Sequence, residues 1–124
     1  MMPRVVHFEI CADQPDRALE FYTNVFGWQV QKAEVPGMDY WLLTTGPDDQ
    51  PGINGAIMPR HNPAAHTTNY VDVDSVDEYT AKITAAGGTV IMAKIPIAGI
   101  GYAAYCMDSE GNPFGLFQDD PSAQ

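Results

Sequence analysis

The sequence predicts an α+β protein built from two consecutive β-α-β-β-β modules. In each half, a strand-like alternation of apolar and polar side chains precedes a helix-like segment. Turn segments rich in Pro, Gly and Asp then divide the rest of each half into short strand-like runs. The two halves also align when shifted by 61 positions, and four identical pairs then begin at Asp13, Asp16, Thr23 and Gly27.

The first module is expected over residues 4–58. Residues 5–10 alternate with period two and predict a strand. A helix should follow, with Asp13 as its N-cap, Pro15 in its first turn and Gly27 at its end. Turn segments then separate three further predicted strands, over residues 28–34, 40–45 and 53–58.

The second module is expected over residues 67–118, after a polar linker at 59–66 and before a tail at 119–124. The order of elements repeats, and both modules belong to a single domain over residues 1–124. We expect a strand at 68–73, a helix at 74–88, and strands at 89–95, 102–107 and 113–118, the last two joined by a turn at Gly111.

Charge and composition exclude several classes of partner. Sixteen acidic and six basic residues give a formal charge of −10, so nucleic acid and anionic membrane surfaces should be repelled. Cys11 and Cys106 have no metal-site spacing and predict two buried, reduced thiols. We find no basic leader followed by a long apolar run, and the expectation is a cytoplasmic protein.

The candidate functional residues follow from alternation along the strands. His7 and Glu9 share one face of the first strand, opposite Phe8 and Ile10. In the second module, Thr68, Tyr70 and Asp72 share one face in the same way. Several aromatic residues are candidates for lining a cavity that accepts a flat or apolar ligand: Tyr40, Trp41, Tyr70, Tyr102 and Phe117.

Three segments carry a resemblance to a known family. They are "RALEFYTNVFGW", "AAGGTVI" and "DSEGNPFGL". With the repeated modules, they make the chain similar to the glyoxalase, bleomycin-resistance and extradiol-dioxygenase superfamily, also called the vicinal oxygen chelate (VOC) proteins. The resemblance implies a cup-shaped mixed sheet with the helices outside, a homodimer, and in many members a divalent ion such as Ni, Zn, Fe, Co or Mn.

The metal ligands that the resemblance implies are mostly missing. His7 matches the first histidine ligand, but Gly55, Thr68 and Gly115 stand in the other three positions. A single histidine does not hold a divalent ion, since stable sites need three or four ligands, and no cofactor is therefore expected. An unusual metal site is the alternative, if Glu9 and Asp72 converge with His7 and if the linker residues His61 and His66 fold over the cup.

Three functions follow from these residues. The leading one is a glyoxalase-like protein that binds a small molecule without a metal, with His7, Glu9, Thr68, Tyr70, Asp72 and Phe117 as ligand-binding residues. The second is a metal-dependent lyase, isomerase or dioxygenase that uses His7 and Glu9 for catalysis. The third is a non-catalytic interaction or dimerisation module.

Overall fold

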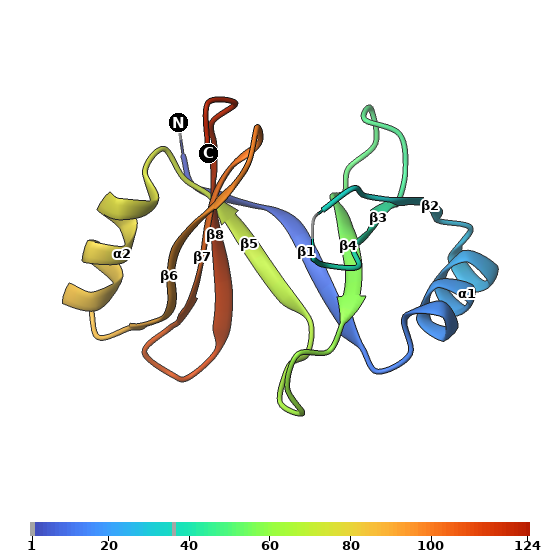
Figure 1. Ribbon diagram of the computed structural model, residues 1–124, viewed down its shortest axis with the longest axis horizontal. Helices are drawn as coiled ribbons and strands as arrows, with labels where there is room; N and C mark the ends of the chain where they lie inside the picture. The colour runs from blue at the N-terminus through green and yellow to red at the C-terminus, as the bar shows by residue number, and fades with distance from the viewer. Residues whose placement is uncertain (1, 36) are drawn as a thin grey trace. The chain divides into compact units, whose positions relative to one another are not determined.

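The computed structural model describes residues 2–35 and 37–124 (Figure 1). His7–Thr67 form one compact unit, called the first unit below. Thr68–Gln124, together with the N-terminal residues up to Val6, form the second unit. The elements are β1 (Arg4–Ala12), α1 (Pro15–Phe26), β2 (Gln29–Lys32), β3 (Trp41–Thr44), β4 (Asn54–Pro59), β5 (Thr68–Asp72), α2 (Val76–Ala85), β6 (Thr89–Ile97), β7 (Gly101–Met107) and β8 (Pro113–Asp119).

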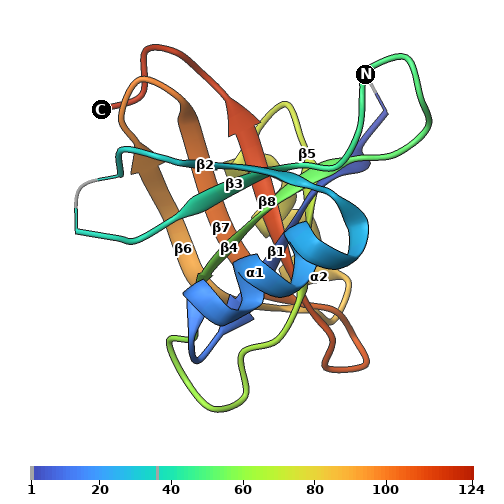
Figure 2. The same cartoon turned by 90° about the vertical axis from the view of Figure 1, so that its right-hand side faces the viewer.

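The first unit packs α1 on one face of a sheet ordered β2-β3-β4-β1 (Figure 2). β1 runs parallel to β4, and the other neighbours are antiparallel. The core lies between this face and the helix, because the apolar positions of the strands alternate toward α1. Its buried members are Ala12, Leu43 and Ile57, with Phe8, Ile10, Ala18, Leu19, Tyr22 and Trp28 packed against them.

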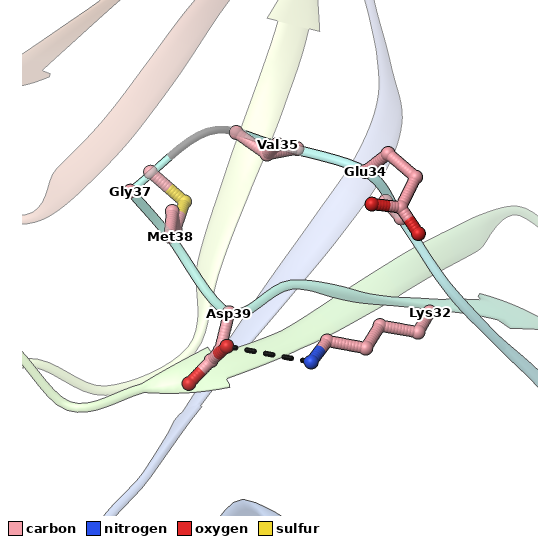
Figure 3. Close-up of a pocket in the computed structure, with 7 residues that line it drawn as sticks. Lys32, Glu34, Val35, Gly37, Met38 and Asp39 are labelled. Carbon is pink, nitrogen blue, oxygen red and sulfur yellow. Dashed lines mark ion pairs between the residues drawn. The ribbon is translucent and has the colours of Figure 1, made fainter.

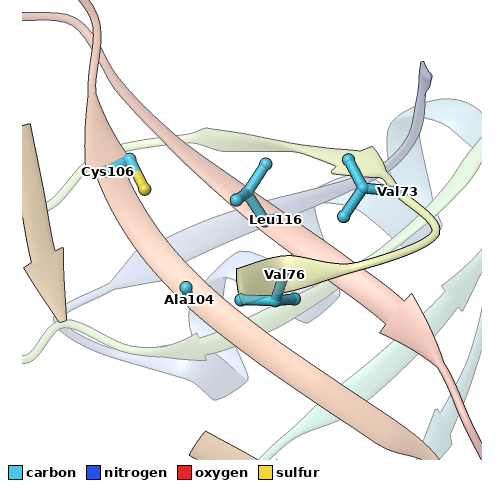
Figure 4. Packing of buried hydrophobic residues seen from close by; sticks show 5 residues of the cluster. All are labelled: Val73, Val76, Ala104, Cys106 and Leu116. Atoms are coloured by element: carbon cyan, nitrogen blue, oxygen red, sulfur yellow. The ribbon is translucent and has the colours of Figure 1, made fainter. Parts of the chain in front are cut away.

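The second unit repeats this arrangement with α2 and a sheet ordered β5-β8-β7-β6. β5 is parallel to β8, and the β8-β7 and β7-β6 pairs are antiparallel. The core between sheet and helix consists of Val73, Val76, Ala104, Cys106 and Leu116 (Figure 4). The two predicted β-α-β-β-β modules are therefore confirmed, and every predicted strand is present with its ends shifted by no more than a few residues.

The start of the first helix differs from the prediction. The N-cap of α1 is Gln14, which makes no side-chain cap hydrogen bond, and not Asp13. Asp13 instead accepts a hydrogen bond from Arg60 Nε at 2.9 Å, which joins the start of α1 to the linker. In α2 the equivalent cap is Ser75, whose hydroxyl accepts from the Glu78 N–H at 3.1 Å. The two caps are still 61 positions apart, so the repeat holds with one residue of offset.

The end of α1 also follows the sequence. Gly27 terminates α1 with φ of 74°, in the left-handed region that glycine adopts without strain.

Both cysteines are buried free thiols, as predicted, and burial raises the pKa of the Cys11 and Cys106 thiols. Within residues 2–35 and 37–124, no helix has the length and apolar character needed to cross a lipid bilayer.

Candidate functional site

His7 and Glu9 lie on the face of the first sheet that α1 does not cover. Their neighbours Phe8 and Ile10 pack on the other face, against the core beneath α1. In the register, His7 pairs with Asn54 and Glu9 with Ala56. The alternation predicted for β1 is thereby confirmed.

The hydroxyl of Tyr40 lies between these two side chains. His7 Nε2 is 3.0 Å from the Tyr40 oxygen, and the Tyr40 hydroxyl donates to Glu9 Oε2 at 2.9 Å. Glu9 is only 4% exposed. A buried carboxylate is costly unless hydrogen bonds compensate it, so Tyr40 contributes directly to keeping Glu9 in this place.

The geometry of this network places its protons. A phenol has one proton, and Tyr40 gives it to the Glu9 carboxylate. The Tyr40 oxygen therefore accepts from His7, which puts a proton on Nε2 and, in the neutral imidazole, the lone pair on Nδ1. Burial lowers the pKa of His7 from its ordinary value of 6.5, and the negative charge of Glu9 opposes this shift.

This shift predicts a loss of stability on acidification. Folded His7 resists protonation, whereas unfolded His7 takes up a proton near pH 6.5, so the free energy of unfolding should fall as the pH drops below that value. Chemical denaturation at a series of pH values measures the effect. His7→Gln should lose this part of the pH dependence, and the matched variant His61→Gln, at an exposed linker position, should keep it. An unchanged pH profile in His7→Gln would contradict the assignment.

Tyr40 is positioned by the hairpin that joins β2 to β3. The Ala33 N–H donates to the Tyr40 carbonyl at 2.8 Å. Lys32 Nζ lies 3.5 Å from Asp39 Oδ1 and 5.5 Å from the centre of the Trp41 ring. Figure 3 shows Lys32 and Asp39 in the small pocket that this hairpin forms. These contacts, on both sides of Tyr40 in the sequence, hold it where its hydroxyl reaches β1.

In the second unit, the predicted ligand-binding residues share one face. Thr68, Tyr70 and Asp72 alternate along β5, and Tyr70 and Asp72 pair in register with Gly115 and Phe117 of β8. Thr68 and Tyr70 are buried. Burial, followed by the charges of Asp119 and Asp74, raises the pKa of the Asp72 carboxyl.

A tyrosine pair occupies the middle of this face. The Tyr70 hydroxyl donates to the Tyr105 hydroxyl, and the two rings meet edge to face with centroids 5.7 Å apart. Gly115 pairs in register with both tyrosines. A Cβ atom at Gly115 would lie 2.8–2.9 Å from the Tyr70 ring, so this ring takes the space of the missing side chain.

The placement of Gly55 corrects the sequence analysis. Gly55 pairs with Phe8, and a Cβ built on it would meet the Phe8 carbonyl oxygen and ring. It therefore lies on the helix-covered face, opposite His7, whereas Ala56 is the residue beside Glu9. A side chain at position 55 would point away from His7, so Gly55 is not the remnant of a ligand that shared a site with it.

The donor set does not fit a divalent metal ion. Among the described residues, no group of three or more His, Cys, Asp or Glu side chains is arranged to hold one. His7 and Glu9 are joined through a phenol, which binds such ions poorly while protonated. His61 and His66 are exposed in the linker. Asp72 belongs to the second unit and His7 and Glu9 to the first, and their convergence stays a prediction.

Sequence reasoning missed two residues of these networks. Tyr40 was expected only as a cavity-lining aromatic, because nothing in the sequence indicates that a residue 31 positions after Glu9 would reach it. Tyr105 was not singled out, although the alternation in "YAAYCM" places it on the opposite face from the buried Ala104 and Cys106.

Comparison with known proteins identifies the family. The model of the Glyoxalase/Bleomycin resistance protein/Dioxygenase superfamily matches residues 4–116. A Mycobacterium tuberculosis protein, provisionally named glyoxylase CFP32, is 33% identical over 114 residues. That match covers 91% of this chain and 43% of the relative, so the chain spans less than half of the relative's length.

Solved structures share the fold at low sequence identity. The hypothetical protein BH1468 from Bacillus halodurans has a TM-score of 0.75 and 14% identity, over 100% of this chain and 99% of that one. A methylmalonyl-CoA epimerase in complex with methylmalonyl-CoA and NH4+ has a TM-score of 0.71 and 17% identity, over 100% of this chain and 99% of that one. The chain belongs to the glyoxalase, bleomycin resistance protein and dioxygenase superfamily.

Proposed function

We propose that this chain binds a small organic molecule, without a metal ion, at the network of His7, Tyr40 and Glu9. One observation carries the proposal: a nearly fully buried carboxylate is held by a phenol beside a histidine, on a sheet face that the helix leaves uncovered. Buried polar groups of this kind weaken a fold unless they are compensated, and they concentrate at functional sites. A ligand bound there would contact hydrogen-bonding groups that the fold holds in fixed positions.

The predicted ligand-binding residues of the second unit are a separate part of the proposal. Thr68, Tyr70, Asp72 and Phe117 share one sheet face of that unit, and we propose this face as ligand-binding in its own right. The rings of Tyr70 and Phe117 suit a flat or apolar ligand. That a structurally similar epimerase was solved with methylmalonyl-CoA supports small-molecule binding in this fold. We also propose a cytoplasmic homodimer, on the composition and the family resemblance.

The alternative is a metal-dependent lyase, isomerase or dioxygenase of the glyoxalase type. The position of His7, which matches a family ligand, and the closeness of Glu9 favour this reading. The provisional name of the mycobacterial relative also points to catalysis. The two functions differ in whether binding requires a metal ion.

A ligand screen tests the proposal. Thermal unfolding is measured with aromatic and glutathione-conjugated compounds, in EDTA and separately with Ni, Zn, Fe, Co or Mn. Compounds that bind the folded state must raise the unfolding temperature. We expect some of these compounds to raise it in EDTA, where no metal ion is available. Tyr40→Phe should weaken the binding of these compounds roughly tenfold, which is the effect of losing about one hydrogen bond to a charged group.

The matched control is Tyr102→Phe. Tyr102 was a candidate for lining a cavity, but its ring packs against the core of the second unit under Lys94, so the variant removes a hydroxyl outside the proposed network. Binding in this variant should equal that of the unmodified protein. Stoichiometric metal binding, with compound effects confined to the metal-loaded protein, would establish the alternative. If no compound raised the unfolding temperature under any condition, both functions would be refuted.

A further inference from the structure

We infer that an apolar surface on α1, formed by Phe21, Val25 and Phe26 and called the α1 patch below, is where two copies of this chain pair. The inference rests on the homodimer in the proposed function and assigns a contact surface to it. All three residues belong to the first unit, on the helix that covers one face of its sheet.

The side chains of the α1 patch are more than half exposed and rest on a fixed aromatic base. Phe21, Val25 and Phe26 are 55%, 56% and 59% exposed. Phe21 meets Tyr22 edge to face, with ring centroids 5.1 Å apart. Phe26 stacks on Trp28 at 5.4 Å, and the rings of Tyr22 and Trp28 stack on each other at 5.1 Å. Tyr22 and Trp28 in turn pack against the core of the first unit.

The equivalent helix of the second unit lacks this surface. The N-caps of α1 and α2 are 61 positions apart, and the same shift places Lys82, Ala86 and Gly87 at the positions of the patch. A β-α-β-β-β module of this protein therefore folds without large apolar side chains there. Half-exposed rings gain free energy when a partner removes them from water, so the difference between the two helices indicates a binding surface on α1.

The size of the α1 patch fits contact with a second copy. With the partly exposed rings beneath it, the patch has roughly 350 Å² of accessible apolar area. A two-fold contact uses the same surface on both copies, so about 700 Å² of apolar area would be buried. The smallest specific interfaces bury about 1,200 Å² in total, of which roughly 60% is apolar. The patch supplies the apolar area that a dimer of this size needs.

The charge of the chain also directs this contact to the patch. Each copy carries a formal charge of −10, so two copies repel wherever their acidic surfaces meet. The patch has no charged side chain, and an apolar surface complements its own copy across a two-fold axis. Salt screens the repulsion and leaves apolar burial intact, so added salt should strengthen the dimer.

A second apolar surface, at the edge of the sheet of the second unit, is the competing contact. β6 is the last strand of this sheet and contains Ile91, which is 56% exposed. Two register shifts interrupt the pairing of β6 with β7, and the strand contains Lys94 and Pro96. Irregular pairing, lysine and proline are features that keep an edge strand from joining another sheet. Ile91 therefore serves as the control position.

Sedimentation equilibrium of the full chain, from about 1 μM to about 1 mM, measures the dissociation constant of the dimer. Val25→Glu should raise this constant at least about a hundredfold, because each contact would then bury two carboxylates. Phe21→Gln removes apolar area without adding charge and should raise it about tenfold. Glutamate and glutamine form helices well and both positions are exposed, so both variants should stay folded, which circular dichroism checks.

Ile91→Glu is the matched control, because it adds the same charge as Val25→Glu at a position of equal exposure. It should change the dissociation constant by less than about twofold. If Val25→Glu dimerised as tightly as the unmodified protein, or if Ile91→Glu alone disrupted the dimer, the inference would be overturned and the homodimer would stand with another surface. A dimer that weakens as salt is added would also overturn the inference, because ion pairs would then hold it.

An unmodified protein that stays monomeric over the whole concentration range would overturn the homodimer together with the inference. The ligand screen is decided separately, since none of these variants changes a residue of the His7, Tyr40 and Glu9 network. Failure of the dimer contact and failure of small-molecule binding are therefore distinguishable.

Discussion

Replacing Gly55 with alanine should lower the free energy of unfolding by about 3 kcal/mol, the upper part of the range for overpacked cores. A Cβ atom at this position would lie 2.5 Å from the Phe8 carbonyl oxygen and 2.6 Å from the Phe8 ring. The nearest of these atoms belongs to the backbone of β1, which pairs with β4 and cannot move away without breaking the ladder. Denaturant unfolding measures the change.

Gly46→Ala is the matched control for this substitution. A Cβ atom at Gly46 would meet only the end of the Gln50 side chain, at 3.9 Å, so its stability should change by no more than about 0.5 kcal/mol. An equally mild effect at Gly55 would show that position 55 can accept a side chain. That result would reopen the reading of Gly55 as a lost ligand position.

Replacing Gly115 with alanine should cost about 2 kcal/mol, for a different reason. The clash here is with the ring of Tyr70, at 2.8–2.9 Å, and that ring is fixed by burial and by its contacts with Tyr105. The obstacle is a side chain, so it can be removed by mutation. In a Tyr70→Ala background, Gly115→Ala should cost less than about 0.5 kcal/mol.

This double-mutant cycle tests whether the Tyr70 ring occupies the space of a side chain at position 115. A strong coupling between positions 70 and 115 means that the tyrosine pair and the glycine form one packed feature. If Gly115→Ala is equally costly with and without the Tyr70 ring, the penalty comes from the strand itself. The assignment of the steric clash at position 115 to the Tyr70 ring would then be wrong.

The order of elements could be predicted from the sequence because each element follows from short-range rules. Alternation gave the strands, and the αL glycine Gly27 marked the end of α1. The N-cap of α1 was misplaced because Asp13 is a better capping residue than Gln14 by type. The structure gives Asp13 another partner, Arg60, which is 47 positions away and has no local signature.

In the candidate site, too, the sequence predicts features of one strand but not contacts between segments that are distant in the chain. Alternation placed His7 with Glu9, and Tyr70 with Asp72, because a side chain's face follows from its position along one strand. The resemblance matched Gly55 to a ligand position, but the orientation of this residue relative to His7 depends on the register between β1 and β4, which the sequence does not state. Tyr40 reaches Glu9 only through the hairpin between β2 and β3, a long-range arrangement of the same kind.

The structure also changes the meaning of His7. In the family resemblance it is a metal ligand, and the alternative function keeps that role. In this structure the His7 imidazole is hydrogen-bonded to the Tyr40 hydroxyl, which in turn donates a hydrogen bond to the buried Glu9 carboxylate. Burial lowers the pKa of His7, so the neutral ring acts as a hydrogen-bonding group at neutral pH. The proposed function therefore assigns His7 a hydrogen-bonding role in place of the metal-ligand role that the resemblance implies.

The most direct test of this claim is the side-chain NMR signal of His7 during titration with benzamide, one of the aromatic compounds of the ligand screen, in EDTA and with added Ni or Zn. The account predicts that benzamide shifts the His7 signal in EDTA, to the same extent and with the same affinity as in the presence of either metal. A His7 signal that responds to benzamide only after a metal ion is added would contradict metal-independent binding and establish a metal site at His7.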